Sequence, residues 1–336
     1  MENAKFGNNE NYIIEGSIFD YRPAGQRPAL TGQLARFEKI AGLPDEEIDL
    51  AEAALLIASL EYTGLDEVFY LNRLDEIADE ARPLFASETN PLKNIERLNL
   101  FLNQNMGFHG NETDYNDRRN SFLNDVLERR TGIPITLSLV YIELGKRLGL
   151  HFEGIGLPGH FIIRYRELES QPLGSSDRLN SGLENLERQE EVSRPSTGPN
   201  SDILLDPFNG GTILSEEDCV DLVRERYGRV LPLQPLFTRP VTNRQFLMRM
   251  LNNIKASCIS DEDYVRALEI QECLVMLHPQ SPEEKRDRGV LYLRNGELGP
   301  AILDFKYYLR KAGDASDAGL IRKQLGLAMD QLVQRN

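Results

Sequence analysis

One segment of the chain, from Pro134 to Leu148, is apolar on nearly every side of the helix that its sequence predicts. Proline is favoured in the first turn of a helix, where its missing N–H is not needed. Gly149 follows the last apolar residue, as glycine often does where a helix ends. Because a helix without a polar face has to be covered on all sides, we expect a central helix with other layers packed around it.

Three short strands are predicted after this helix, at residues 152–155, 160–165 and 203–205. The second and third strands are separated by residues 166–202, which are rich in Ser, Gly, Pro, Asn, Glu and Arg. This composition favours disorder, and a long insertion in a hairpin loop costs little free energy. We therefore expect an α+β core with a flexible insertion, for which a functional lid is the alternative.

Helices are predicted before this core, and an irregular tail precedes them. Between residues 30 and 105, apolar residues recur every three to four positions, which is typical of amphipathic helices. The first 29 residues are polar and rich in asparagine, without the basic and apolar regions of a secretion signal. We expect a disordered or extended tail there, and no stretch of the chain has the apolar length of a membrane-spanning helix.

The C-terminal third repeats with a period of 34 residues. Ala267 and Ala301 are 34 positions apart. In the second unit Gly289, Tyr292 and Phe305 have the spacing of a helix–turn–helix repeat of the tetratricopeptide (TPR) type. The match is partial, because the chain contains no tryptophan. One such unit cannot bury its apolar face alone, so we expect further helices stacked on it.

Charge and cysteine content exclude several classes of function. The formal net charge of −15 argues against broad nucleic-acid binding and against docking on anionic membranes. Three cysteines, an odd number without metal-like spacing, fit a reducing cytoplasm. The four histidines have no spacing that suggests a metal site, and no phosphate-binding glycine motif is present. We expect no metal and no cofactor.

The core carries the layout of a cysteine-nucleophile site without its cysteine. A glycine-led helix start, His160 at the start of one strand and Asp206 at the end of the next would normally hold the nucleophile, its base and the group that orients the base. The helix-start position is Pro134, which has no nucleophilic atom.

Two hydroxyl groups nearby, those of Thr136 and Ser138, are the candidate substitutes. One helical turn displaces a residue by about 5.4 Å, whereas a nucleophile has to lie about 3 Å from its base. The favoured interpretation is that both hydroxyls bond back to helix carbonyls.

Four sequence blocks, taken in order, resemble the bacterial SirB-type transglutaminase-like proteins. They are residues 119–124, 128–135, 156–161 and 205–211. The resemblance implies a mostly helical α+β fold, in which N-terminal helices surround a papain-like core of one helix and an antiparallel sheet, and a TPR-like helical array follows. It further implies that Pro134 occupies the position of the family's cysteine, His160 that of the base and Asp206 that of the orienting carboxylate.

The domain organisation expected from these patterns has three parts. Residues 1–29 form the tail, residues 30–233 the SirB-type transglutaminase-like domain, and residues 243–336 the TPR-like repeats.

The favoured functional interpretation is a non-catalytic protein-binding or scaffold protein of the bacterial cytoplasm, a pseudoenzyme whose protein or peptide partner lies in the TPR groove or the core cleft. The candidate binding residues are Arg119, Asn120, His160, Asp206 and Asn209. Structural roles are the alternative: a buried His–Asp pair that holds the sheet, and a solvated loop of Asp–Arg pairs around Arg119. The rival function is a hydrolase or acyl transferase that uses His160 and Asp206 with a non-cysteine nucleophile.

Overall fold

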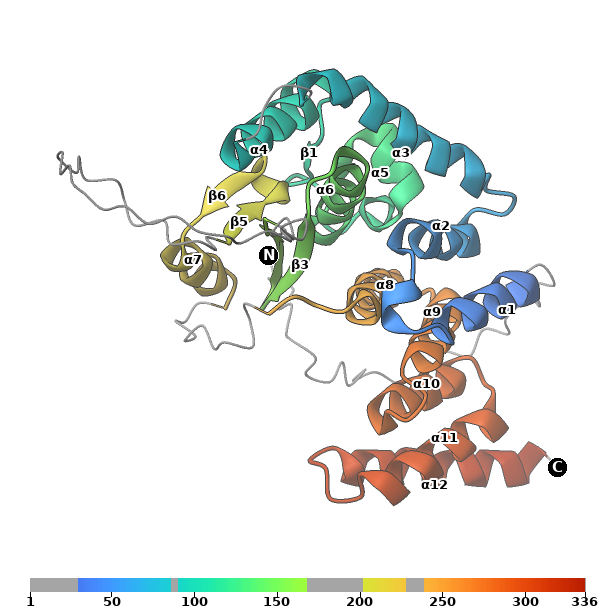
Figure 1. Ribbon diagram of the computed structural model, residues 1–336. Helices are drawn as coiled ribbons and strands as arrows, with labels where there is room; N and C mark the ends of the chain where they lie inside the picture. Colours follow the sequence, from blue (N-terminus) through green and yellow to red (C-terminus); the bar gives the residue numbers. More distant parts are fainter. Residues whose placement is uncertain (1–29, 86–89, 168–201, 228–238, 336) are drawn as a thin grey trace, which may run out of the picture.

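The computed structural model describes residues 30–85, 90–167, 202–227 and 239–335 (Figure 1). The predicted tail and nearly all of the predicted insertion lie outside these residues. Within them, no helix is both long enough and apolar enough to cross a membrane.

The centre of the fold is α6 (Pro134–Leu148), packed on an antiparallel sheet. The strands are β3 (Phe152–Leu157), β4 (His160–Tyr165), β5 (Ile203–Asp206) and β6 (Thr212–Leu214), and each pairs with the next. Every residue of α6 from Pro134 to Gly145 is buried, which confirms the predicted central helix. The three predicted strands are confirmed, and β6 is an addition, because a three-residue strand is too short to show a pattern.

The helices that precede α6 are α1 (Leu30–Ala41), α2 (Leu50–Glu61), α3 (Glu67–Ala81), α4 (Pro91–Leu100) and α5 (Leu123–Arg129). Of these, α2, α3 and α5 contact α6, whereas α1 packs on α2 and α9 (Tyr264–Leu277) (Figure 1). Side chains of Asp49, Asp66 and Asn90 accept hydrogen bonds from the first backbone N–H groups of α2, α3 and α4. Short turns lie between them: η1 (Asp45–Glu47), η2 (Arg82–Leu84), η3 (Phe101–Asn105) and η4 (Arg118–Ser121).

A very small parallel sheet lies beside the start of α6. It consists of β1 (His109–Gly110) and β2 (Thr131–Gly132), paired residue by residue. After the main sheet come the turn η5 (Pro207–Asn209) and helix α7 (Glu216–Tyr227), whose Cys219 and Val223 pack with Ile155 and Ile162. The outer side of the sheet is therefore covered by α7, which contributes a small second cluster of apolar residues.

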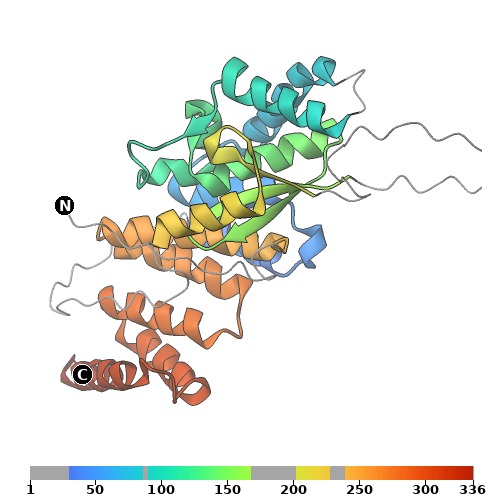
Figure 2. The same cartoon turned by 90° about the vertical axis from the view of Figure 1, so that its left-hand side faces the viewer.

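The C-terminal part is a stack of helical hairpins (Figure 2). Its helices are α8 (Asn243–Ser260), α9 (Tyr264–Leu277), α10 (Pro282–Arg294), α11 (Leu298–Lys311) and α12 (Ala318–Arg335). Ala267 and Ala301 are completely buried. A Cβ atom on Gly289 would lie 2.8 Å from the Phe305 ring, so this glycine permits the close helix contact that the repeat pattern predicts.

The first two of these helices share one hydrophobic core with the N-terminal helices. This core joins Leu247, Ile254 and Ile270 to α1, α2 and α6. Polar contacts reinforce it, because the Asp45 carboxylate accepts hydrogen bonds from the backbone N–H groups of Asn243 and Arg244 at 2.9 and 2.8 Å. The helical array is therefore built directly onto the core, while α11 and α12 form their own apolar clusters at the far end.

Candidate functional site

His160 and Asp206 are hydrogen bonded to each other at one end of the sheet. His160 begins β4 and Asp206 ends the neighbouring β5. The distance from His160 Nε2 to Asp206 Oδ2 is 2.9 Å. Asp206 is completely buried, whereas the His160 side chain remains 13% exposed. We refer to these two side chains as the His–Asp pair.

The Asp206 carboxylate is held by two further donors. Its Oδ2 also accepts from Asn209 Nδ2 at 2.8 Å, and its Oδ1 accepts from the backbone N–H of Phe208 at 3.0 Å. An ionised carboxylate only accepts hydrogen bonds, so it orients His160 with Nε2 as the donor. In the neutral ring Nδ1 is then an acceptor. Within the described residues, Nδ1 of His160 has no hydrogen-bond partner.

An aromatic side chain connects this pair to the start of α6. The Phe208 ring packs edge-on to His160 at 6.2 Å and to Tyr115 at 6.0 Å between centroids. It also covers Gly110 of β1, where a Cβ atom would lie 2.6 Å from the ring. Since Gly110 pairs with Gly132, two residues before Pro134, the His–Asp pair and the start of α6 belong to one packed region.

The start of α6 is fastened by Thr136. Its hydroxyl donates to the backbone carbonyl of Asn120 at 2.7 Å and accepts from the N–H of Ile133 at 3.1 Å. The hydroxyl therefore caps the helix and ties down the preceding loop. The Ser138 hydroxyl is buried without a partner among the described residues. In that part of the chain, no hydrogen bond joins either hydroxyl to His160.

Asn120 and Arg119 occupy different environments. Asn120 is completely buried, and its amide donates to the carbonyl of Asp114 at 2.8 Å and accepts from Asn111 at 3.0 Å. The Arg119 side chain is exposed and forms an ion pair with Asp117 at 2.9 Å. Asn120 thus shapes the loop from inside. Of the predicted binding residues, Arg119 and Asn209 are exposed at the surface.

Three polar residues that no sequence motif had indicated hold the turn after Asp206. Asn99 donates to the carbonyl of Gly211 at 2.7 Å, and Asn103 donates to that of Gly210 at 2.8 Å. Tyr141 of α6 reaches the same place, where its hydroxyl accepts from Asn103 at 3.4 Å. Burial raises the pKa of Tyr141, so its hydroxyl stays protonated. Two asparagines, one turn apart in an otherwise helical stretch, were the available signal, since asparagine is disfavoured inside helices.

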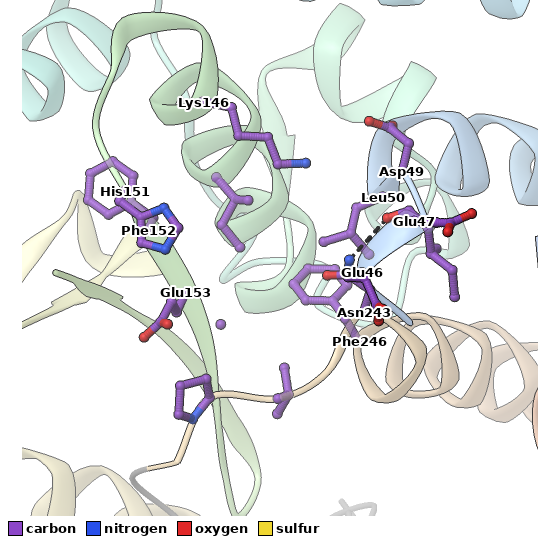
Figure 3. A pocket seen from close by; sticks show the side chains of 15 residues that line it. Glu46, Glu47, Asp49, Leu50, Lys146, His151, Phe152, Glu153, Asn243 and Phe246 are labelled. Carbon is purple, nitrogen blue, oxygen red and sulfur yellow. Dashed lines mark hydrogen bonds between the residues drawn. The ribbon is translucent and has the colours of Figure 1, made fainter. Parts of the chain in front are cut away.

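A pocket of about 370 Å³ lies elsewhere, at the other end of β3 (Figure 3). It is formed where η1, α6, β3 and α8 meet. Lys146 and His151 lie on one side of it, and Glu46 and Glu47 lie across from them. Neither His160 nor Asp206 lines this pocket, and no sequence motif had indicated it.

The described part of the chain supports neither a metal site nor a reactive thiol. No group of three or more His, Cys, Asp or Glu side chains there could hold a metal ion. Cys219, Cys258 and Cys273 are buried. Burial raises the pKa of the Cys219 thiol to about 11 and that of the Cys258 thiol to about 12. A thiol in this state is a poor nucleophile at neutral pH.

Comparison with known proteins identifies both parts of the chain. The family model of the transglutaminase-like superfamily matches residues 69–252, and a tetratricopeptide repeat model matches residues 254–326. A UPF0162 protein of Xylella fastidiosa (strain Temecula1) is 30% identical over 90% of this chain and 97% of its own length. Protein SirB1 of Salmonella typhimurium is 24% identical over 78% of this chain and 86% of its own.

A more distant match covers only a segment. F-box only protein 21 of Homo sapiens is 38% identical over 71 residues, which is 21% of this chain and 11% of that protein. No solved structure matches the chain.

Proposed function

The chain belongs to the SirB-type branch of the transglutaminase-like superfamily, and we propose that it is a non-catalytic protein-binding or scaffold protein. Its partner is a protein or peptide held by the TPR repeats or by the surface beside the His–Asp pair. The observation that carries this proposal is the chemistry at the start of α6. Pro134 has no nucleophilic atom, and the hydroxyl of Thr136 is committed to capping the helix.

The repeats supply the binding surface in this proposal. Stacked helical repeats present an extended concave surface, and they use it to hold other polypeptides. The presence of TPR repeats makes protein partners the natural class. With a net charge of −15, nucleic acid is disfavoured because a phosphate backbone needs a basic surface. The three free cysteines fit a bacterial cytoplasmic setting, because thiols are kept reduced there.

The test compares the proteins captured from the native cell by three forms of the full chain. The wild type and H160A should capture the same partners, since the imidazole has no catalytic part in a scaffold. A301R should lose them, because it places a charge in the packed interface of the repeats. Circular dichroism confirms that H160A is folded, and hydrogen exchange in α6 confirms that A301R keeps its core. Loss of capture in H160A with the fold intact would place the binding surface beside the His–Asp pair, and capture of no protein by the wild type would contradict the proposal.

A second candidate function rests on a separate observation. Asp206 orients His160 so that the unpartnered Nδ1 can accept a proton. A water molecule bound there would be deprotonated by Nδ1 and would attack an acyl carbon. The C–N or C–O bond would then break, with the imidazolium returning the proton to the departing amine or alcohol, which gives a hydrolase without a protein nucleophile. The test is turnover of a panel of peptide amides and p-nitrophenyl esters. Activity that disappears in both H160A and D206N, with folding intact, would support this function over the scaffold.

A further inference from the structure

Helix α8 holds the hairpin that carries His160, and it runs from the region of the transglutaminase-like match into that of the repeat match. Arg249, in the second turn of α8, donates through Nη2 to the carbonyl of His160 at 2.6 Å and to that of Leu157 at 2.9 Å. These two carbonyls flank the turn between β3 and β4. The guanidinium also lies over the ring of Phe161, 5.3 Å from its centroid. Hydrogen bonds from a charged donor are about twice as strong as neutral ones, so this contact fixes the backbone of His160.

Two glycines in β3 allow α8 and the residues just before it to approach the hairpin of β3 and β4 closely. A Cβ atom on Gly156 would lie 3.2 Å from Arg249 Nη1 and 3.2 Å from Val241. On Gly154 it would lie 2.8 Å from the Phe161 ring and 3.2 Å from Val241. Side chains at these positions would push the repeats away from the hairpin. The close approach of Arg249 therefore depends on the absence of side chains at these two positions of β3.

The other end of α8 contacts the loop that leads to α6. Ser257 donates to the carbonyl of Asn116 at 3.3 Å. Arg118 forms ion pairs with Asp261 at 2.8 Å and with Asp263 at 3.2 Å. This loop continues to Asn120, whose carbonyl holds Thr136 at the start of α6. Residues 249 and 257 are about 12 Å apart along a helix, so α8 touches both the His160 hairpin and the loop that fastens α6.

We propose that Arg249 is a positioning residue for His160, and that it couples the state of the repeats to the geometry of the His–Asp pair. A shift of α8 changes the two bonds that hold the His160 backbone, and through them the orientation of the imidazole toward Asp206. Coupling of this kind is reciprocal, so a change at the pair is felt in the repeats. The positioning role of Arg249 stands by itself, whereas the coupling of the repeats to the His–Asp pair rests on the proposed function.

The experiment uses the full chain and four variants: R249A, R249K, R249Q and R244A. R244A is the matched control, because Arg244 is also on α8 and its guanidinium also donates to carbonyls. Those carbonyls belong to Ala41, Leu43 and Leu277, away from the pair. Two measurements report on His160 itself. They are the ¹⁵N shifts of its ring, which reveal the tautomer, and its rate of acylation by diethyl pyrocarbonate, followed by mass spectrometry.

We expect R249A to change the acylation rate by about threefold or more, the scale on which directly coupled residues influence each other. The ring shifts should move with it. R249K should lie closer to the wild type than R249Q, because an ammonium can donate to the same two carbonyls. R244A should leave both measurements unchanged.

Two results would overturn the inference: no change at His160 in any Arg249 variant, or the same change in R244A. R249K and R249Q carry the test should R249A not fold. The two proposals are tested separately. An Arg249 variant that loses protein capture but shows no change at His160 contradicts this inference and leaves the scaffold proposal standing. A change at His160 in a protein that captures no partner supports the positioning role and counts against the proposed function.

Discussion

Thr136 and Asn120 are joined by a hydrogen bond of 2.7 Å from the threonine hydroxyl to the asparagine carbonyl. Both residues are completely buried. Thr136→Val removes the hydroxyl with little change in shape and leaves that carbonyl and the N–H of Ile133 unpaired. We expect the free energy of unfolding to fall by about 1–3 kcal/mol, measured by urea denaturation. The control is Thr212→Val, where the hydroxyl donates to a carbonyl at an exposed position. Equal losses in the two variants would contradict the assigned role.

Asp206→Asn tests whether the pair also stabilises the sheet. The variant places an amide where Oδ1 and Oδ2 accept from Phe208, Asn209 and His160. The NH₂ group replaces either Oδ2, which accepts from Asn209 and His160, or Oδ1, which accepts from Phe208, so at least one donor loses its acceptor. We expect a loss of about 1–3 kcal/mol in unfolding free energy, together with a change of the His160 tautomer in ¹⁵N NMR. An unfolding free energy equal to that of the wild type would contradict the stabilising role of the pair.

Gly289→Ala and Gly326→Ala form a matched pair in the repeats. A methyl group at 289 would lie 2.8 Å from the Phe305 ring, whereas at 326 it would meet nothing within 4 Å. We expect Gly289→Ala to destabilise the protein by about 1–3 kcal/mol through overpacking. Gly326→Ala, inside α12, should stabilise it by about 0.5–1 kcal/mol through the better helix propensity of alanine. Thermal unfolding of both variants gives the comparison, and a shift of the same sign in both would refute it.

Ala301→Arg should damage the array locally. Ala301 has no exposed surface and belongs to the cluster of Phe305, Tyr308 and Ile321. A buried arginine without a partner cannot be accommodated there, and repeats contact mainly their neighbours. Hydrogen exchange should speed up in α10, α11 and α12 while α6 keeps its protection. Loss of protection in α6 would mean that the repeats and the core unfold as one unit.

Alkaline pH should destabilise the fold through its buried thiols. Burial is the main cause that raises the pKa of Cys258 from 9.0 to about 12. An acid with a raised folded pKa keeps its proton in the folded state while the unfolded state loses it. Its stabilising contribution is therefore complete below pH 9 and is lost as the pH rises toward 12. In Cys258→Ala, unfolding free energy should fall less steeply above pH 9 than in the wild type. Identical slopes would contradict this.

The sequence predicted those features that depend on local patterns. The apolar residues on nearly all sides of the segment from Pro134 to Leu148 indicated the buried helix, and the placement of His160 and Asp206 on neighbouring strands predicted the proximity of the two side chains. The 34-residue period correctly placed Ala301 at a buried position. In each case the information lies within one element or in the pairing of adjacent elements.

Other features depend on contacts between distant parts of the chain. Asn99 meets Gly211 across 112 residues, and Arg249 meets His160 across 89. No local sequence pattern shows which distant residue an asparagine or an arginine on a helix will contact. Neither of these two contacts could therefore be derived from spacing. The pocket at the start of β3 is formed by four separate segments and was invisible for the same reason.

The shared core of α2 and α8 also constrains how the chain is made. Asp45 bonds to the backbone of Arg244 across 199 residues, and Arg266 bonds to the carbonyl of Leu60 across 206. Contacts of such long range slow folding, and a ribosome delivers the N-terminal segment first. The helices from α1 to α6 therefore emerge with part of their apolar surface uncovered, and it stays uncovered until α8 and α9 have been synthesised. During that interval the nascent chain exposes a surface that chaperones bind, and a ribosome stalled before residue 243 would leave an aggregation-prone fragment.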